Sequence, residues 1–119
     1  MTPTQRWLDG YIRAWESKHP DDVRAIFTDE AEYWFRPDHP RPARGIDAIV
    51  AVWAEPESPA PQHDLRVLVE DERIGIVTGT IVYPGHASYA NLGEVHLAAD
   101  GRAHRFVEWY MTTPEADAG

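Results

Sequence analysis

Hydrophobic residues near the N-terminus repeat at helical spacing. They recur at i, i+1, i+4, i+5 and i+8, which predicts a helix from about residue 4 to residue 18. The residues that form its apolar face are Trp7, Leu8, Tyr11, Ile12 and Trp15. A short second helix is predicted next, because Pro20 suits a first helical position and the aspartates after it suit a positive helix start. Its apolar residues are Val23, Ile26 and Phe27.

A third helix is predicted in IDAIVAVWAE, where four apolar residues again have helical spacing and Pro56 follows. These are Ile46, Ile49, Val50 and Trp53. Proline-rich segments flank this helix at residues 37–45 and 56–62, and both are expected to be loops.

The remaining pattern predicts strands. AEYWFRP is rich in aromatic residues and ends at Pro37, so it reads as a first strand. Four more segments alternate or are β-branched, and short turns (DER, GHAS and ADGR) join them. These segments are DLRVLVE, IGIVTGTIVYP, YANLGEVHLA and AHRFVEWYM. The order predicts one α+β domain over residues 1–119, a curved antiparallel sheet with three helices on its concave face and a frayed tail at 113–119.

Composition narrows the choice of partners. The net charge is −9 and the basic residues are scattered, which argues against nucleic acid and anionic membranes. The absence of cysteine excludes disulfides and thiolate sites. No apolar run approaches membrane-spanning length and the N-terminus lacks an apolar signal core, so we expect a cytoplasmic protein. Thirteen aromatic residues are many for this length and suit a core or a pocket wall.

Four sequence segments carry a family resemblance. They are YIRAWESKHPDDVRAIFTDEAEYWFRP, RGIDAIVAVW, YANLGEVHL and EWYM. In this order they resemble the nuclear transport factor 2-like superfamily, in its SnoaL-like branch. The resemblance implies a cone with an internal pocket, a homodimer that often forms through the outer face of the sheet, and no cofactor. The superfamily includes isomerases, cyclases, dehydratases, epoxide hydrolases and non-catalytic binding proteins, so the fold does not settle activity.

Ketosteroid isomerase, in which the surroundings tune the pKa values of carboxyl groups, is the relative whose mechanism we compare with this sequence. Its oxyanion-donating tyrosine matches Tyr11. Its catalytic aspartate falls at Phe35 and its protonated aspartate falls at Gly93, and neither residue here can do that work. We therefore reject ketosteroid isomerisation by that constellation. The epoxide hydrolases of this fold use an Asp–Arg–Asp arrangement, and we identify no residues in this sequence that match it.

Glu108 is the main candidate for chemistry. Phe106, Glu108 and Tyr110 alternate with Val107, Trp109 and Met111 along the last strand, so the two sets face opposite sides. The resemblance turns the first set toward the pocket. Burial there would raise the pKa of Glu108 and suit it to proton transfer, with Tyr11 and Asn91 orienting a carbonyl. The expected pocket wall is Trp15, Tyr33, Phe35, Trp53, Tyr83, Val95, Phe106 and Tyr110.

Several alternatives stay open. Glu108 could be a structural, hydrogen-bonded carboxylate, or the strand could be turned so that Trp109 faces the pocket. The functions considered are a cofactor-free isomerase, cyclase or dehydratase acting on a small apolar or aromatic oxygenated compound, a binding protein for such a ligand, and a dimerisation module.

The other polar candidates are weaker. No two of the six histidines form a helical metal-ligand pair, so no metal site is expected. In the 37–45 loop and just before it, Asp38 and His39 could supply a base, and Arg36, Arg41 and Arg44 could grip an acid or balance nearby carboxylates.

Overall fold

The computed structural model describes residues 1–56 and 60–113. Three helices, α1 (Pro3–Ser17), α2 (Pro20–Arg24) and α3 (Ile46–Trp53), accompany six strands in one sheet. The strands are β1 (Phe27–Trp34), β2 (Ala43–Arg44), β3 (Gln62–Glu70), β4 (Ile74–Tyr83), β5 (Ala87–Leu97) and β6 (Ala103–Thr112). This is the predicted α+β class. None of the helices in these residues is long and apolar enough to cross a membrane.

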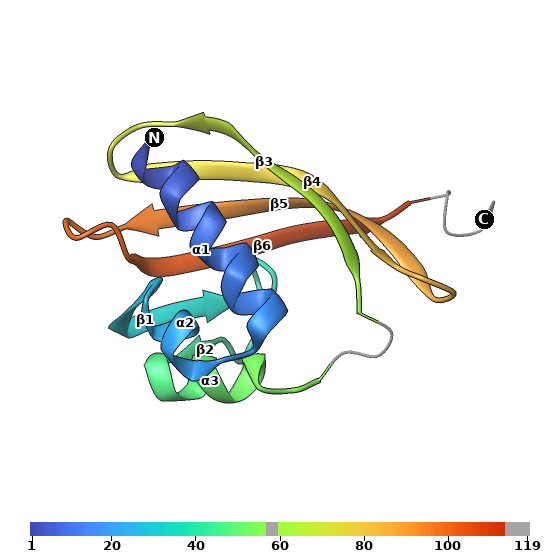
Figure 1. The fold of residues 1–119 in the computed structure, drawn as a ribbon, viewed down its shortest axis with the longest axis horizontal. Coiled ribbons are helices and arrows are strands. Elements are labelled where there is room, and N and C mark those ends of the chain that lie inside the picture. Colours follow the sequence, from blue (N-terminus) through green and yellow to red (C-terminus); the bar gives the residue numbers. More distant parts are fainter. Residues whose placement is uncertain (57–59, 114–119) are drawn as a thin grey trace.

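The strands lie in the order β2-β1-β6-β5-β4-β3, so the sheet is antiparallel except where β1 runs parallel to β6. The last four strands form a meander, with each strand hydrogen-bonded to the next in the chain. A bulge between Val67 and Val69 interrupts the outermost strand, β3. Helix α1 crosses one face of the sheet, while α2 and α3 lie beside β1 and β2 (Figure 1).

Aromatic side chains hold the helices against the sheet. The rings of Trp7 and Tyr11 on α1 lie 5.5 and 5.6 Å from the ring of Phe106 on β6. Trp53 on α3 lies 5.1 Å from Tyr11 and 6.2 Å from Tyr33 on β1. Because one set of rings joins α1, α3, β1 and β6, both helices pack on the face of the sheet that carries Phe106.

Several boundaries differ from the sequence prediction, and two of the differences have a clear physical reason. Helix α2 ends at Arg24, and Phe27 begins β1 instead of closing the helix. The segment predicted as a loop at 37–45 contains the short strand β2, whose Ala43 and Arg44 pair with Tyr33 and Glu32. In both places pairing with a distant strand outweighs the local pattern, which is how tertiary contacts override propensity.

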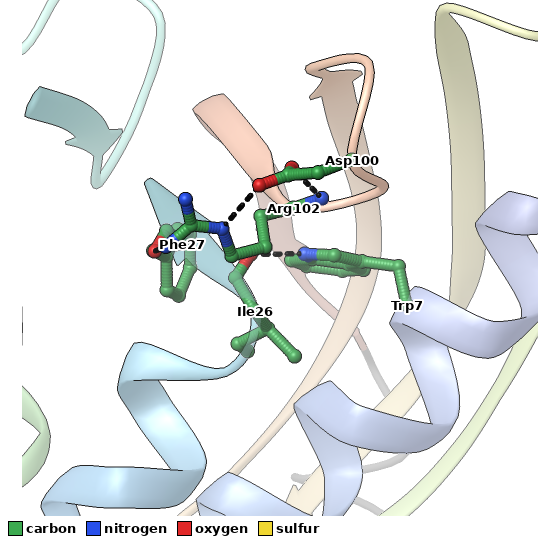
Figure 2. Close-up of polar contacts among 5 residues, drawn as sticks. All are labelled: Trp7, Ile26, Phe27, Asp100 and Arg102. Atoms are coloured by element: carbon green, nitrogen blue, oxygen red, sulfur yellow. Dashed lines mark hydrogen bonds and ion pairs between the residues drawn. The ribbon is translucent and has the colours of Figure 1, made fainter. Parts of the chain in front are cut away.

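Hydrogen bonds from both sides anchor the start of β1 (Figure 2). The carbonyl of Ile26 accepts a 2.8 Å hydrogen bond from the indole Nε1 of Trp7, and another of 2.8 Å from the backbone N–H of Ala103. Arg102 reaches the Phe27 carbonyl at 3.5 Å while its Nε donates to Asp100 at 2.7 Å. These contacts tie the beginning of β1 to α1 and to the β5–β6 turn.

Candidate functional site

A cavity of about 600 Å³ lies between the helices and the inner face of the sheet. Nine of the residues singled out in the sequence line it: Tyr11, Trp15, Tyr33, Phe35, Trp53, Tyr83, Asn91, Glu108 and Tyr110. All five tyrosines of the chain are among the lining residues. The wall is therefore mostly aromatic, with hydroxyl groups distributed along it.

Strand parity brings the polar residues of β5 and β6 into this cavity. In the antiparallel pairing, Glu108 lies opposite Gly93, and Tyr110 lies opposite Asn91. Side chains on directly opposed residues share a face, so Glu108 and Asn91 are diagonal neighbours on the inner side. Trp109 lies on the outer side, where its Nε1 donates to Glu94 at 2.6 Å. The arrangement with Trp109 in the pocket is thus not the one adopted.

The Glu108 carboxyl is partly buried, and its environment changes its acidity. Burial, which disfavours the charged form, raises its pKa from 4.5 to about 7, against a smaller lowering by a hydrogen bond from Asn91. The oxygen of that amide, Asn91 Oδ1, is buried with no hydrogen-bond partner. A carboxyl with a pKa near neutrality can both release and accept a proton at physiological pH.

Two tyrosines share the deep part of the site. The hydroxyl groups of Tyr11 and Tyr33 are hydrogen-bonded to each other, and burial raises the pKa of Tyr33 well above its ordinary value, with Tyr11 and Glu108 adding to the shift. The Tyr33 phenol therefore stays protonated and can act as a hydrogen-bond donor.

Two predicted wall residues are placed differently. Val95 is fully buried and does not line the cavity. Phe106 is 2% exposed and borders only a small adjoining cavity of about 20 Å³. Both point to the inner face, as their parity requires, but they lie where α1 packs directly on the sheet and leaves no open space.

The sequence argument did not name some lining residues as site residues. They are Lys18, Val52, His86, Ala87 and Tyr89. Continuing the odd-numbered parity of β5 from Asn91 to Tyr89 and Ala87 would have found two of them. Lys18 follows the end of α1, and His86 lies in the turn between β4 and β5. At neither position does a periodic pattern indicate where the side chain points.

Comparison with protein families decides the affiliation. The model of the SnoaL-like domain matches residues 8–115, nearly the whole chain. The chain belongs to the SnoaL-like domain family. Comparison with curated proteins finds no significant match.

Solved structures agree with the SnoaL-like fold. A steroid delta-isomerase from Pseudomonas aeruginosa superposes with a TM-score of 0.68 at 14% identity, covering 99% of this chain and 86% of that chain. An NTF-2 like protein of unknown function from Burkholderia xenovorans LB400 gives 0.74 at 17%, covering 93% and 84%. An LEH-like epoxide hydrolase from M. tuberculosis gives 0.65 at 13%, covering 89% and 80%. At these identities the likeness establishes the fold alone.

Within this SnoaL-like domain, neither of the two positions that the resemblance matches to acids of ketosteroid isomerase is acidic, and position 93 is crowded. A Cβ atom added at Gly93 would lie 2.8 Å from Cε1 of Phe106. Phe35, at the other acidic position, is an aromatic wall residue whose ring lies 5.2 Å from that of Tyr33. Glu108 is accordingly the one acidic residue among the described lining of the cavity.

The polar residues around the 37–45 loop do not enter the SnoaL-like cavity. Arg36 pairs with Asp38 at 3.2 Å, and Arg44 lies 3.9 Å from Glu32. The ring of His39 packs on Phe35, while its Nδ1 accepts from the Arg41 N–H. Within residues 1–56 and 60–113, no group of three or more histidine or carboxylate residues could hold a metal ion.

Proposed function

We propose that this SnoaL-like domain is a cofactor-free enzyme that moves a proton on a small, mostly apolar, oxygenated compound. Glu108 is the general base and acid, Tyr11 donates a hydrogen bond to the substrate carbonyl, and Asn91 holds the carboxyl in place. The reaction class is isomerisation, cyclisation or dehydration, in which the same group removes a proton from one atom and returns it at another.

The observation that carries this proposal is the position of Glu108. Its carboxyl lines the cavity, and its pKa of about 7 matches the operating range of a proton shuttle. A carboxylate kept only for structure would be expected to have charged or multiple hydrogen-bonding partners that lower its pKa. Glu108 has instead one amide partner and a largely aromatic surround.

The cavity suits a small ligand. Its volume of about 600 Å³ falls within the range typical of small-molecule sites, roughly 300–1,000 Å³. Its tyrosines offer apolar ring faces together with hydroxyl groups, which fits a compound with an apolar body and a few oxygens. Proteins of this fold include a steroid delta-isomerase and an epoxide hydrolase, neither of which is close in sequence to this chain.

Deuterium exchange tests the proposal without knowledge of the natural substrate. The neutral ketone 2-tetralone has acidic C–H groups next to its carbonyl, and base removes one of these protons to leave an enolate. In D₂O, return of a deuteron to that carbon is followed by NMR. We expect the wild-type protein to accelerate exchange over buffer, and Glu108→Gln to lose about 100-fold or more of the acceleration, as removal of a general base does.

Two measurements make the result decisive. Glu30→Gln, at an exposed position on β1, removes the same charge away from the cavity and should keep the wild-type rate. Quenching of tryptophan fluorescence reports whether the ketone binds. Binding with no acceleration over buffer would overturn the proton-transfer role and favour a ligand-binding protein of the same fold.

A further inference from the structure

Asn91 is the sole asparagine of the chain, and it lies in the middle of β5. Asparagine is depleted in strands, because its side chain is polar and competes with the backbone for hydrogen bonds. Alternation puts Asn91 on the same side of the strand as Ala87 and Tyr89, which also line the cavity. The amide therefore faces the ligand space, where a polar group needs a partner.

The two ends of the Asn91 amide have different surroundings. Its N–H end donates a hydrogen bond to the Glu108 carboxyl. Its oxygen, Oδ1, is buried and has no hydrogen-bond partner, which is a net loss for the folded chain. One other buried side-chain atom in the described residues lacks a partner, Thr4 Oγ1, and Thr4 packs near Gly75 and does not line the cavity. The unpaired acceptor at Asn91 is thus the one that a ligand could satisfy.

The amide lies at the boundary between two spaces. Tyr11, Ile81, Asn91 and Glu108 border both the cavity of about 600 Å³ and the small adjoining cavity of about 20 Å³. A space of roughly 10–15 Å³ is enough for one water-sized group, so the small cavity has room for a hydroxyl. The side chain of Asn91 is only half-buried, and the torsion that turns its amide has a broad range, so Oδ1 can turn toward a group placed there.

A hydroxyl group matches both neighbours at this boundary. Its hydrogen can be donated to Asn91 Oδ1, and its oxygen can accept a hydrogen bond from Glu108 when that carboxyl is protonated. A carbonyl or an ether has no hydrogen to donate, and the nitrogen of an amide cannot accept. An ammonium would place a charge where burial already disfavours the charged form of Glu108. The chemistry of the site therefore favours an alcohol.

We infer that the substrate is a hydroxy ketone, whose hydroxyl donates to Asn91 Oδ1 while its carbonyl accepts a hydrogen bond from Tyr11. Tyr11, Asn91 and Glu108 all border the small cavity, so the two oxygens of such a ligand lie a few bonds apart, close to the carbon that Glu108 deprotonates. This inference rests on the proposed function, because it names the substrate class of the same cavity. Asn91 binds the hydroxyl in this scheme and receives no proton.

Two ligands of nearly equal size test the recognition of the hydroxyl. 4-Hydroxy-1-tetralone and 4-methyl-1-tetralone share a ring system and a carbonyl, and only the first has an O–H group. Both dissociation constants are measured by calorimetry at pH 7, and their ratio cancels the contribution of the shared rings. For the wild-type protein we expect the hydroxy compound to bind about 10-fold more tightly, since the methyl compound leaves a buried acceptor unpaired.

Variants at Asn91 separate the role of its oxygen from that of its N–H groups. Asn91→Leu has no acceptor and should lose the preference for the hydroxy compound. Asn91→Asp has nearly the same shape, loses the donor and retains an acceptor oxygen, so it should keep the preference. Ser88→Ala removes a hydroxyl from the outer side of the same strand and should also keep it. Thermal melting of each variant confirms that it is folded.

Two outcomes would overturn the inference. One is a wild-type protein that does not prefer the hydroxy compound, and the other is an undiminished preference in Asn91→Leu. Neither outcome bears on proton transfer, because 2-tetralone has no hydroxyl for this oxygen to recognise. Conversely, absence of deuterium exchange with 2-tetralone would leave an Asn91-dependent preference for the hydroxy compound standing.

Discussion

Gly93 lies directly opposite Glu108 in the β5–β6 pairing. The position that faces the carboxyl across the sheet therefore has no side chain, and the ring of Phe106 fills the space over it. Phe106 in turn packs against Trp7, Tyr11 and Tyr33. The contacts that seal the core beneath Glu108 thus crowd the position opposite it, and Glu108 is the one acid in the described lining of the cavity.

Filling the space at Gly93 should destabilise the fold. A Cβ there would meet Cε1 of Phe106 at 2.8 Å and Cγ2 of Val77 at 3.0 Å. We expect Gly93→Ala to lower the free energy of unfolding by about 1–3 kcal/mol, as overpacking does. Urea denaturation measures this. Phe106→Leu in the same chain should recover part of the loss, and strictly additive effects of the two substitutions would contradict direct contact.

Local pattern was sufficient where residues repeat along one element. Alternation along β6 puts Glu108 and Trp109 on opposite faces, and the family resemblance adds which of the two faces is the inner one. The apolar face of α1 follows from the spacing of Trp7, Tyr11 and Trp15. The fold class follows from the order of such elements together with the family resemblance, and the SnoaL-like match agrees with it.

Features that depend on distant contacts escaped prediction. The local pattern predicts that Phe27 is helical. In the structure its neighbour Ile26 accepts hydrogen bonds from Trp7 and Ala103, and Phe27 begins a strand. The pairing of Ala43 and Arg44 with β1 is invisible in a proline-rich segment. Strand alternation predicts that the side chain of Val95 points inward, but not whether it is buried in the core or lines the cavity. That depends on how closely α1 approaches the sheet. Lys18 was missed since a residue after a helix end has no period.

The hydrogen bond between the Trp7 indole and the Ile26 carbonyl should contribute to stability. Trp7→Phe keeps an aromatic ring but removes the Nε1 donor, which lies 2.8 Å from that buried oxygen (Figure 2). We expect a loss of about 1–2 kcal/mol in the free energy of unfolding. Trp34→Phe is the matched control, because its Nε1 donates to Glu32 in a less buried place, and its cost should be smaller. An equal cost for both would contradict this account.

The outer face of the sheet is the proposed site of homodimerisation. Trp109 and Met111 on β6 are 47% and 68% exposed there, which is unusual for large apolar side chains. We expect light scattering to give the mass of a dimer, and Met111→Lys to give that of a monomer. Leu68→Lys alters a side chain that is 53% exposed on β3, three strands away, and should remain dimeric. A monomeric wild-type protein would exclude this proposal.

The raised pKa of Glu108 should make stability depend on pH. Its carboxyl has a pKa near 4.5 when unfolded and about 7 when folded, so between these values the folded chain holds a proton that the unfolded chain has released. Stability therefore falls as pH rises through this window, by up to about 3 kcal/mol, and the loss is complete above pH 7. Glu108→Gln removes this titration. Urea midpoints at pH 5 and pH 8 should thus differ more for the wild type than for the variant.

Asn91 should hold the pKa of Glu108 below the value that burial alone would give. Its hydrogen bond favours the charged carboxylate, whereas the aromatic surround disfavours it. Asn91→Leu keeps a similar volume and removes the donor, so the pKa of Glu108 should rise above about 7. The carboxyl carbon, observed by NMR in protein with ¹³C-labelled glutamate, reports the titration, and Glu94 on the outer face serves as an internal reference. An unchanged or lowered midpoint for Glu108 would mean that this amide does not stabilise the carboxylate.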